Sequence, residues 1–215
     1  MKRFEIITLF PEACAPYAQS SILGRAQKNK LIKISTHQLR DFSTSRHQKV
    51  DDSPYGGGPG MVMAVEPFDH AIKKIKRGKK SRVIITSASG KRFNQSDARR
   101  LAKYNQLIFL CGRYEGIDAR VEEHLADEAL SIGDFVLTGG ELPALTMIDA
   151  VARMIPGVLG KVDSLNQESH TEEGVLEYPQ YTKPEVYKKW RVPEILLSGD
   201  HKKIDAWRQN HQSKS

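Results

Sequence analysis

The stretch LIFLCGRYEGIDARVEEHLADEALSI, residues 107–132, contains in one run the unit from which the fold can be predicted. Its two apolar ends, residues 107–111 and 129–132, have the length and composition of short buried strands, and residues 117–124 between them have a helical pattern. A glycine-bearing turn separates the first strand from the helix. Strand, turn, helix and strand in this order predict a parallel sheet covered by helices.

The same alternation continues on both sides of this stretch. The further elements that we predict are strands at residues 4–10, 32–36 and 82–86 and helices at residues 11–28, 67–76 and 95–103. The fold class is therefore α/β, with a parallel sheet at its core.

Composition limits the class of protein. Of the 215 residues, 39% are apolar and 27% charged, which is typical of a packed globular chain. No apolar run approaches the roughly 20 residues that cross a bilayer, and the first residues lack a signal-peptide cleavage site, so we expect a soluble, cytoplasmic protein with no membrane partner. Cys14 and Cys111 lie far apart without the spacing of a zinc site or a disulfide framework.

The charge of the chain suits a partner rich in phosphate. The formal net charge is +7 and the isoelectric point is near 9.3, and Lys and Arg side chains release the counterions that condense on nucleic acids. Many basic proteins bind no nucleic acid, so the charge by itself leaves an RNA or DNA partner open.

Two segments interrupt the periodic pattern. Residues 40–63 are polar and then rich in glycine, as in a long loop that is either functional or simply solvated. Residues 161–176 are polar without apolar period and predict a linker between a core of residues 1–160 and a small basic domain of residues 177–215. In that domain we expect two short helices, at residues 184–190 and 200–210.

Several nucleotide and hydrolase motifs are missing, but three glycine-bearing turns follow predicted strands. The sequence contains no P-loop, no G-x-G-x-x-G, no H-E-x-x-H and no G-x-S-x-G. The turns are residues 87–90, 111–116 and 132–141, each at the carboxyl end of a strand, where open α/β sheets bind ligands. One such turn is ordinary architecture, whereas three on one edge favour a ligand that is held largely by main chain.

Five strings in the sequence carry a resemblance to a known family. They are SPYGGGPGM (53–61), LCGRYEGIDARV (110–121), SIGDFVLTGGELPAL (131–145), IPGVLG (155–160) and YPQYTKPEV (178–186). From residue 1 to about residue 208 the chain resembles the bacterial tRNA (guanine-N1)-methyltransferases of the SPOUT superfamily. The resemblance implies a deep trefoil knot in the parallel sheet, a homodimer whose subunits share each active site, and S-adenosylmethionine-dependent methylation of N1 of guanine-37 in tRNA.

The resemblance also assigns the methyl donor to the three turns. The residues it nominates are Ser87, Gly112, Tyr114, Glu115, Gly116, Ile132, Gly133, Phe135, Leu137, Gly139, Gly140 and Pro143. Ile85 and Ala88 stand where relatives commonly have Tyr and Pro, so the fit around the adenosine differs there.

Methylation at guanine N1 requires removal of a proton, which a carboxylate can accept, while an arginine can stabilise the charge that develops on O6. The resemblance assigns these roles to Glu168, where relatives have Asp, and to Arg153. Glu172 and Glu173 are alternative acids, and a solvated acidic linker is the structural alternative.

The remaining assignments concern the RNA. The resemblance places His47 and Asp51 against the anticodon loop of tRNA and makes Gly58, Pro59 and Gly60 the wall of the target pocket. It implies dependence on magnesium, although no acidic cluster marks a metal site. Relatives continue beyond the position of Ser215, so we expect a shortened C-terminal domain.

Two rival functions fit the same resemblance. One is another knotted RNA methyltransferase that acts on ribose 2′-hydroxyls. The other is a catalytically impaired relative that only binds RNA.

Overall fold

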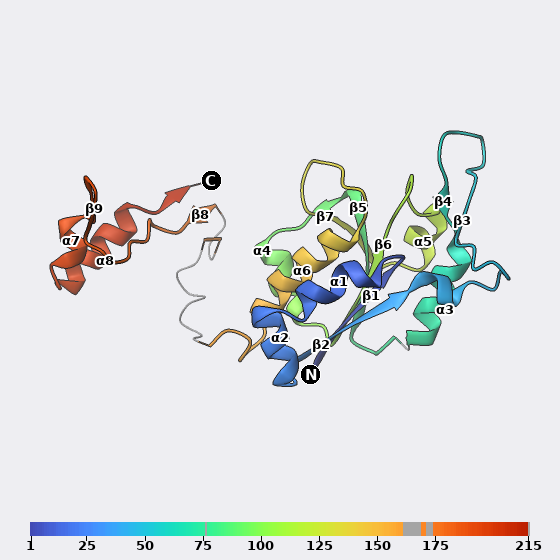
Figure 1. Ribbon diagram of the computed structural model, residues 1–215, viewed down its shortest axis with the longest axis horizontal. Helices are drawn as coiled ribbons and strands as arrows, with labels where there is room; N and C mark the ends of the chain where they lie inside the picture. The colour runs from blue at the N-terminus through green and yellow to red at the C-terminus, as the bar shows by residue number, and fades with distance from the viewer. Residues whose placement is uncertain (76, 161–168, 171–173, 215) are drawn as a thin grey trace. The chain divides into compact units, whose positions relative to one another are not determined.

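The computed structural model describes residues 1–75, 77–160, 169–170 and 174–214, and the chain divides into two compact units, Met1–Gly160 and Lys161–Ser215 (Figure 1). The first unit contains the sheet and its helices.

The first unit is built on a parallel sheet of five strands. These are β1 (Lys2–Thr8), β2 (Ile32–Gln38), β5 (Ser81–Arg92), β6 (Gln106–Cys111) and β7 (Glu128–Ser131), in the spatial order β2-β1-β6-β5-β7. The α/β class and the parallel sheet predicted from the sequence are confirmed. Every carboxyl end lies at the same edge of the sheet, which brings the segments after β5, β6 and β7 together.

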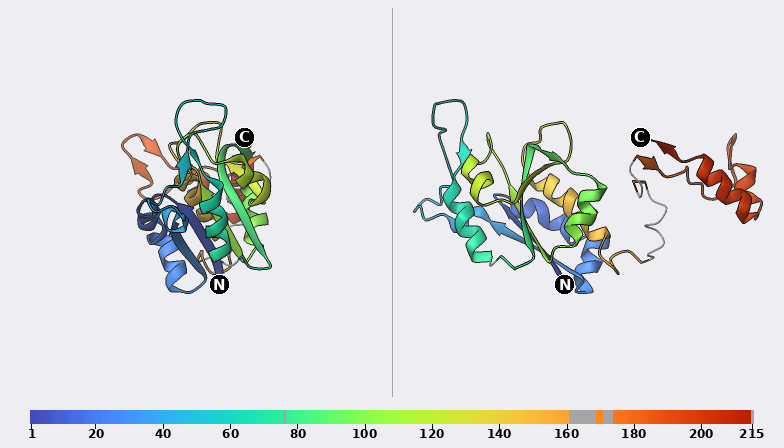
Figure 2. Two further views of the ribbon diagram at one scale, coloured as in Figure 1. Left: turned by 90° about the vertical axis from the view of Figure 1, so that its right-hand side faces the viewer. Right: turned by 180° about the vertical axis from the view of Figure 1, so that it is seen from behind.

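Helices cover both faces of this sheet (Figures 1 and 2). One face carries α1 (Pro11–Ala18), α2 (Ser21–Lys28), α4 (Gln95–Ala102) and α6 (Glu141–Arg153), and the other carries η1 (Leu39–Phe42), α3 (Val65–Ile75) and α5 (Ala119–His124). Residues 11–28 form two helices rather than one, because the backbone of Ser20, between α1 and α2, is extended (φ −92°, ψ 161°). Among the described residues, no helix has the length and apolarity to cross a membrane.

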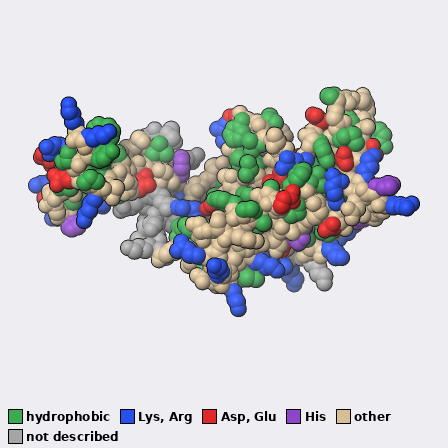
Figure 3. Space-filling model, viewed as in Figure 1, with side chains coloured by type: hydrophobic (Ala, Val, Ile, Leu, Met, Phe, Trp, Pro, Cys, Tyr) green, Lys and Arg blue, Asp and Glu red, His purple; other side chains and the backbone are tan. Residues whose placement is uncertain are grey.

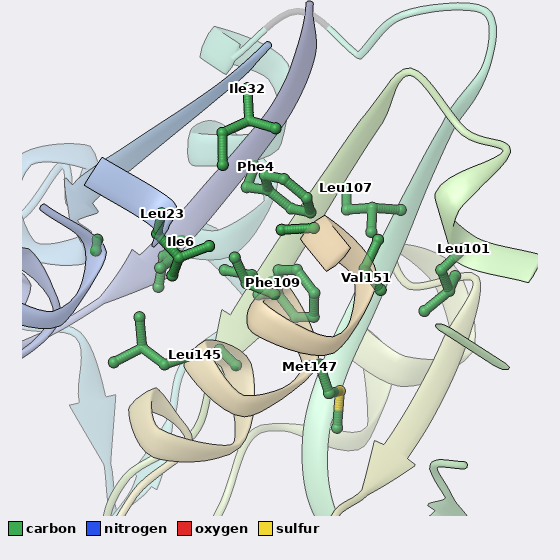
Figure 4. Packing of buried hydrophobic residues seen from close by; sticks show 14 of the residues in the cluster. Phe4, Ile6, Leu23, Ile32, Leu101, Leu107, Phe109, Leu145, Met147 and Val151 are labelled. Carbon is green, nitrogen blue, oxygen red and sulfur yellow. The ribbon is translucent and has the colours of Figure 1, made fainter. Parts of the chain in front are cut away.

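The central strand β6 shows why the pattern predicted a sheet buried on both sides. Leu107 and Phe109 point into the core beneath α6, whereas Ile108 and Leu110 point into the opposite core, and all four are 0% exposed (Figure 4). Side chains of a strand alternate between faces, so a strand apolar at every position needs a core on both sides.

Strand β5 is longer than predicted. Residues 87–90 belong to the strand instead of forming a turn after it, and the pairing with β7 shifts register between Thr86 and Lys91. A Cβ at Gly90 would lie 2.6 Å from the carbonyl carbon of Ala129, so glycine is needed where the two strands come closest. The first predicted turn is therefore an irregularity within a strand.

An ion-pair network fixes β7 at the edge of the sheet. Glu128 accepts hydrogen bonds from Arg82 Nε at 2.9 Å and from Arg100 Nη2 at 2.6 Å. Burial alone would raise the pKa of the Glu128 carboxyl, but the hydrogen bonds from Arg100 and Arg82 outweigh it and hold that pKa below its usual value. The segment that follows β7 thus starts from an anchored strand.

The long loop at residues 40–63 contains two short strands, β3 (Asp51–Asp52) and β4 (Val62–Met63), which pair with each other. Its end is attached to the segment after β6. Met63 N donates to Gly116 O at 3.0 Å, Glu115 N to Met61 O at 3.1 Å, and Asp118 N to Met63 O at 2.9 Å. The loop therefore ends beside the second glycine-bearing turn.

In the second unit, the described residues form two small antiparallel pairs and two helices. β8 (Val175–Leu176) pairs with β11 (Ser213–Lys214), β9 (Val186–Tyr187) pairs with β10 (Trp190–Arg191), and the helices are α7 (Glu194–Leu197) and α8 (His201–Asn210). The helix predicted at residues 200–210 is confirmed. The one predicted at residues 184–190 is wrong, because Val186, Tyr187 and Trp190, which favour strands, lie in the hairpin β9–β10.

Candidate active site

The segments that follow β6 and β7 meet the irregular part of β5 around a cleft of about 360 Å³. Eleven of the twelve residues nominated for the methyl donor line this cleft. They are Ser87, Gly112, Tyr114, Glu115, Gly116, Ile132, Phe135, Leu137, Gly139, Gly140 and Pro143. The cleft lies within the volume range of small-molecule sites, about 300–1,000 Å³.

Gly133 is the nominated residue that does not line the cleft. A Cβ at this position would lie 2.3 Å from Cε1 of Phe135. Gly133 therefore makes room for the Phe135 ring, which itself borders the cleft. Figure 3 shows hydrophobic side chains gathered over this loop, where Phe135 and Val136 are 54% and 85% exposed.

Gly140 occupies the tightest position at the cleft. Its amide donates to Gly112 O at 3.0 Å, and a Cβ built on it would lie 2.0 Å from Thr86 Oγ1 and 2.8 Å from Cys111 Cα. The chain that leaves β7 at the sheet edge thus returns directly against the ends of β5 and β6 before α6 begins. A side chain at position 140 has no space there.

A buried ion pair that the sequence did not predict supports the same wall. Glu141, 3% exposed, accepts hydrogen bonds from Thr8 Oγ1 at 2.5 Å and from Arg113 Nε at 3.1 Å. Arg113 also donates through Nη1 to Thr138 O at 3.2 Å and lies 4.4 Å from the centre of the Phe10 ring. The pair thereby links the end of β1 and the turn after β6 to the loop that precedes α6.

Replacing Arg113 with methionine is expected to lower the free energy of unfolding by roughly 3 kcal/mol, near the low end for removing one partner of a buried pair. Methionine keeps much of the volume but leaves the Glu141 carboxylate, with its side chain 4% exposed, without this cation. Urea unfolding measures the loss. Arg92→Met is the matched control, since its pair with Asp134 is 63% and 81% exposed, and a loss as large in that variant would contradict the role of Arg113.

Both cysteines lie beneath this wall and are buried. Burial, reinforced by the negative charge of Glu141, raises the pKa of the Cys14 thiol to about 11 and raises that of Cys111 as well. Neutral thiols are poor nucleophiles, so these side chains have a packing role.

The residues predicted to contact RNA lie on the long loop. Gly60 is next to the cleft, since a Cβ there would lie 2.5 Å from Cγ of Glu115, and its φ of 74° favours glycine. Gly58 also has a positive φ, at 136°, and Pro59 lies between the two. Asp51 pairs with Met63 in the short strands and His47 is exposed; neither lines the cleft.

Of the two residues predicted to be catalytic, the structure describes only Arg153, which does not line this cleft. Arg153 is the last residue of α6. It lies ten positions after Pro143, which corresponds to roughly 15 Å along the helix. Glu168 lies outside the described residues, as do Glu172 and Glu173. In the described part of the chain, no group of three or more His, Cys, Asp or Glu side chains could hold a metal ion.

Comparisons with known proteins identify the family of the chain. The family model described as tRNA (Guanine-1)-methyltransferase TrmD matches residues 1–215. The chain is 50% identical over 209 residues to a tRNA (guanine-N(1)-)-methyltransferase of Dehalococcoides mccartyi, covering 96% of this chain and 84% of the relative. It is 51% identical over 208 residues to that of Ruminiclostridium cellulolyticum, covering 96% and 89%.

A third relative matches over the whole of this chain. The chain is 50% identical over 214 residues to the tRNA (guanine-N(1)-)-methyltransferase of Dictyoglomus turgidum, covering 100% of this chain and 86% of the relative. With a family model matched over all of its residues and relatives this similar, the chain belongs to the tRNA (guanine-N1)-methyltransferase family.

Proposed function

We propose that this protein is an enzyme that transfers a methyl group from S-adenosylmethionine to N1 of guanine-37 in tRNA, next to the anticodon. The observation that carries the proposal is the glycine-lined cleft at the carboxyl edge of the sheet, in a chain matched along its whole length by the family. With tRNA as its substrate, the enzyme would act in the cytoplasm.

The lining of the cleft suits this cofactor. Ile132, Phe135 and Leu137 offer apolar surface for the adenosine, and the glycines expose main-chain groups that can hydrogen-bond to it. Glu115 contributes a carboxylate, which complements a cation. When bound, S-adenosylmethionine supplies an electrophilic methyl group on a positively charged sulfur.

A trefoil knot is part of the proposal. Its support is the return of the chain at Gly140 against Thr86 and Gly112, between the ends of two inner strands. A segment threaded through the loop after β6 requires such contact between backbones.

We assign the chemistry on the guanine to Glu168 and Arg153. Glu168 would accept the N1 proton, and the Arg153 guanidinium would stabilise the negative charge on O6 by a charge-assisted hydrogen bond. Arg153 lies at the opposite end of α6 from Pro143, so we propose that two copies of the chain form each active site, with Arg153 and the linker of one copy facing the cleft of the other.

The RNA side of the site would be the long loop. Gly58, Pro59 and Gly60 would border the extruded guanine, and His47 and Asp51 would contact the neighbouring nucleotide. The target base must leave its stack for chemistry at N1, which costs less in an anticodon loop than in a duplex. Residues 177–215 would add affinity for the tRNA, and magnesium would support catalysis.

The test is product analysis. Unmodified tRNA transcripts with guanine at position 37 are incubated with labelled S-adenosylmethionine and digested to nucleosides, and N1-methylguanosine is the expected product. A transcript with adenine at position 37 is the matched control and should remain unlabelled. A 2′-O-methyl product would overturn the proposed reaction, and cofactor binding without incorporation of label would indicate an RNA-binding relative.

A further inference from the structure

The hairpin β9–β10 in the second unit presents two large aromatic rings to solvent. Tyr187 and Trp190 are cross-strand partners, with ring centres 5.7 Å apart and planes inclined by 46°. Their side chains are 55% and 68% exposed. The pair therefore forms an aromatic surface on the hairpin.

The other tryptophan of the chain has the opposite environment. The ring centre of Trp207 lies 6.5 Å from that of Tyr178, 6.4 Å from that of Tyr181 and 4.0 Å from that of His211. Trp207 is thus packed by aromatic neighbours within its unit. The contrast suggests that Trp190 serves a ligand more than the packing of the second unit.

Positive charge surrounds the exposed rings. The hairpin reads VYKKWR, with three cations and no acid in six residues, and Lys188, Lys189 and Arg191 are exposed. The Lys188 ammonium lies 5.6 Å from the centre of the Tyr187 ring and 5.7 Å from that of the Trp190 ring. Figure 3 shows hydrophobic and basic side chains side by side in this part of the second unit.

Aromatic rings beside mobile cations are the features that bind unpaired nucleotides. A base stacks on a ring whatever its sequence, and the adjoining phosphate pairs with Lys or Arg. We propose that the hairpin Val186–Arg191 binds an unpaired nucleotide of RNA, with the base on Trp190 and its phosphate within reach of Lys188. This inference rests on the proposed function in one respect, since the RNA that the hairpin binds would be the tRNA substrate.

Fluorescence can test the contact directly, because the chain has two tryptophans. In a Trp207→Phe variant, Trp190 becomes the reporter, and titration with a single-stranded oligoadenylate RNA at low salt should quench it. Loss of quenching as salt is raised is also expected. An indole already shielded from acrylamide before RNA is added, or one that RNA does not quench, would overturn the inference.

A second measurement covers the case in which Trp207→Phe fails to fold. Trp190→Ala in the otherwise unchanged protein should weaken tRNA binding by about 5- to 150-fold, the range expected for one stacked base, and Trp190→Phe should restore most of it. Lys189→Ala should reduce the salt dependence of binding by about one counterion. Lys202→Ala, on the exposed side of α8, is the matched charge control and should change binding less.

The two proposals fail separately. If Trp190→Ala binds tRNA as tightly as the unchanged protein while N1-methylguanosine still forms, the hairpin site is wrong and the proposed reaction stands. If oligoadenylate quenches Trp190 but no methylated product forms, the hairpin site stands and the proposed reaction is wrong.

Discussion

Replacing Glu168 with alanine is expected to lower the rate of methyl transfer by about 10²- to 10⁴-fold, the usual contribution of a general base. Guanine N1 holds a proton at neutral pH, so its lone pair becomes available to the methyl group only as that proton leaves. Affinity for S-adenosylmethionine should stay close to that of the unchanged protein, because Glu168 is assigned to the guanine and not to the cofactor. Single-turnover methylation and calorimetry measure the two quantities.

Neighbouring acids provide the control for that experiment. Glu172→Ala and Glu173→Ala remove carboxylates from the same polar segment and should leave the rate largely unchanged. Glu168→Asp keeps the carboxylate on a shorter stem and should recover most of the activity. Full turnover by Glu168→Ala would show that another group accepts the proton, with Glu172 and Glu173 the next to test.

Gly140→Ala is expected to abolish most cofactor binding. The added methyl group would lie 2.8 Å from Cys111 Cα and 2.9 Å from Gly112 N, and backbone atoms of a central strand cannot move aside as a flexible side chain can. Overpacking of this kind costs about 1–3 kcal/mol, which corresponds to roughly 5- to 150-fold if it falls on the bound state. Calorimetry with S-adenosylmethionine and urea unfolding together show how the cost divides between cofactor binding and the stability of the fold.

Gly160→Ala is the matched control for this glycine. A Cβ at Gly160 meets no atom of the described residues within 4 Å, so the same change should leave cofactor affinity and unfolding unaltered. Unchanged cofactor affinity in Gly140→Ala would mean that the close approach of α6 to β6 does not shape the cleft, and the proposed cofactor site would then have to be revised.

The sequence predicted those parts of the fold that leave a local pattern. The apolar run of β6 and the glycine turns after β6 and β7 are visible in the sequence. Together they predict the sheet edge that carries the cleft. The sequence predicts a turn at residues 87–90, where the structure has the irregularity within β5, because Ser87 and Gly90 are typical turn residues whether or not the strand continues. The sequence also predicts a helix at residues 184–190, where the structure has the hairpin Val186–Arg191, because so short a segment does not distinguish a helical from a strand periodicity.

Contacts between distant residues left no such pattern. Thr8 and Glu141 are separated by 133 positions, and nothing in the sequence near either one indicates the other. The sequence around Gly112 likewise does not predict whether the chain is threaded, because local conformational preferences are the same in a threaded and an unthreaded sheet. The assignments of Glu168 and Arg153 depend on the family resemblance, and Glu168 lies outside the described residues.

The attachment of the long loop to the turn after β6 has a mechanical consequence. The turn after β6 lines the cleft and continues from β6, a strand buried along its whole length, whereas the loop bonded to that turn has strands of only two residues each. The turn should therefore be stiffer than the loop, because resistance to local opening follows the number of buried contacts. Under the proposed function, the methyl donor would lie against the stiff turn, and the RNA would contact the more compliant loop.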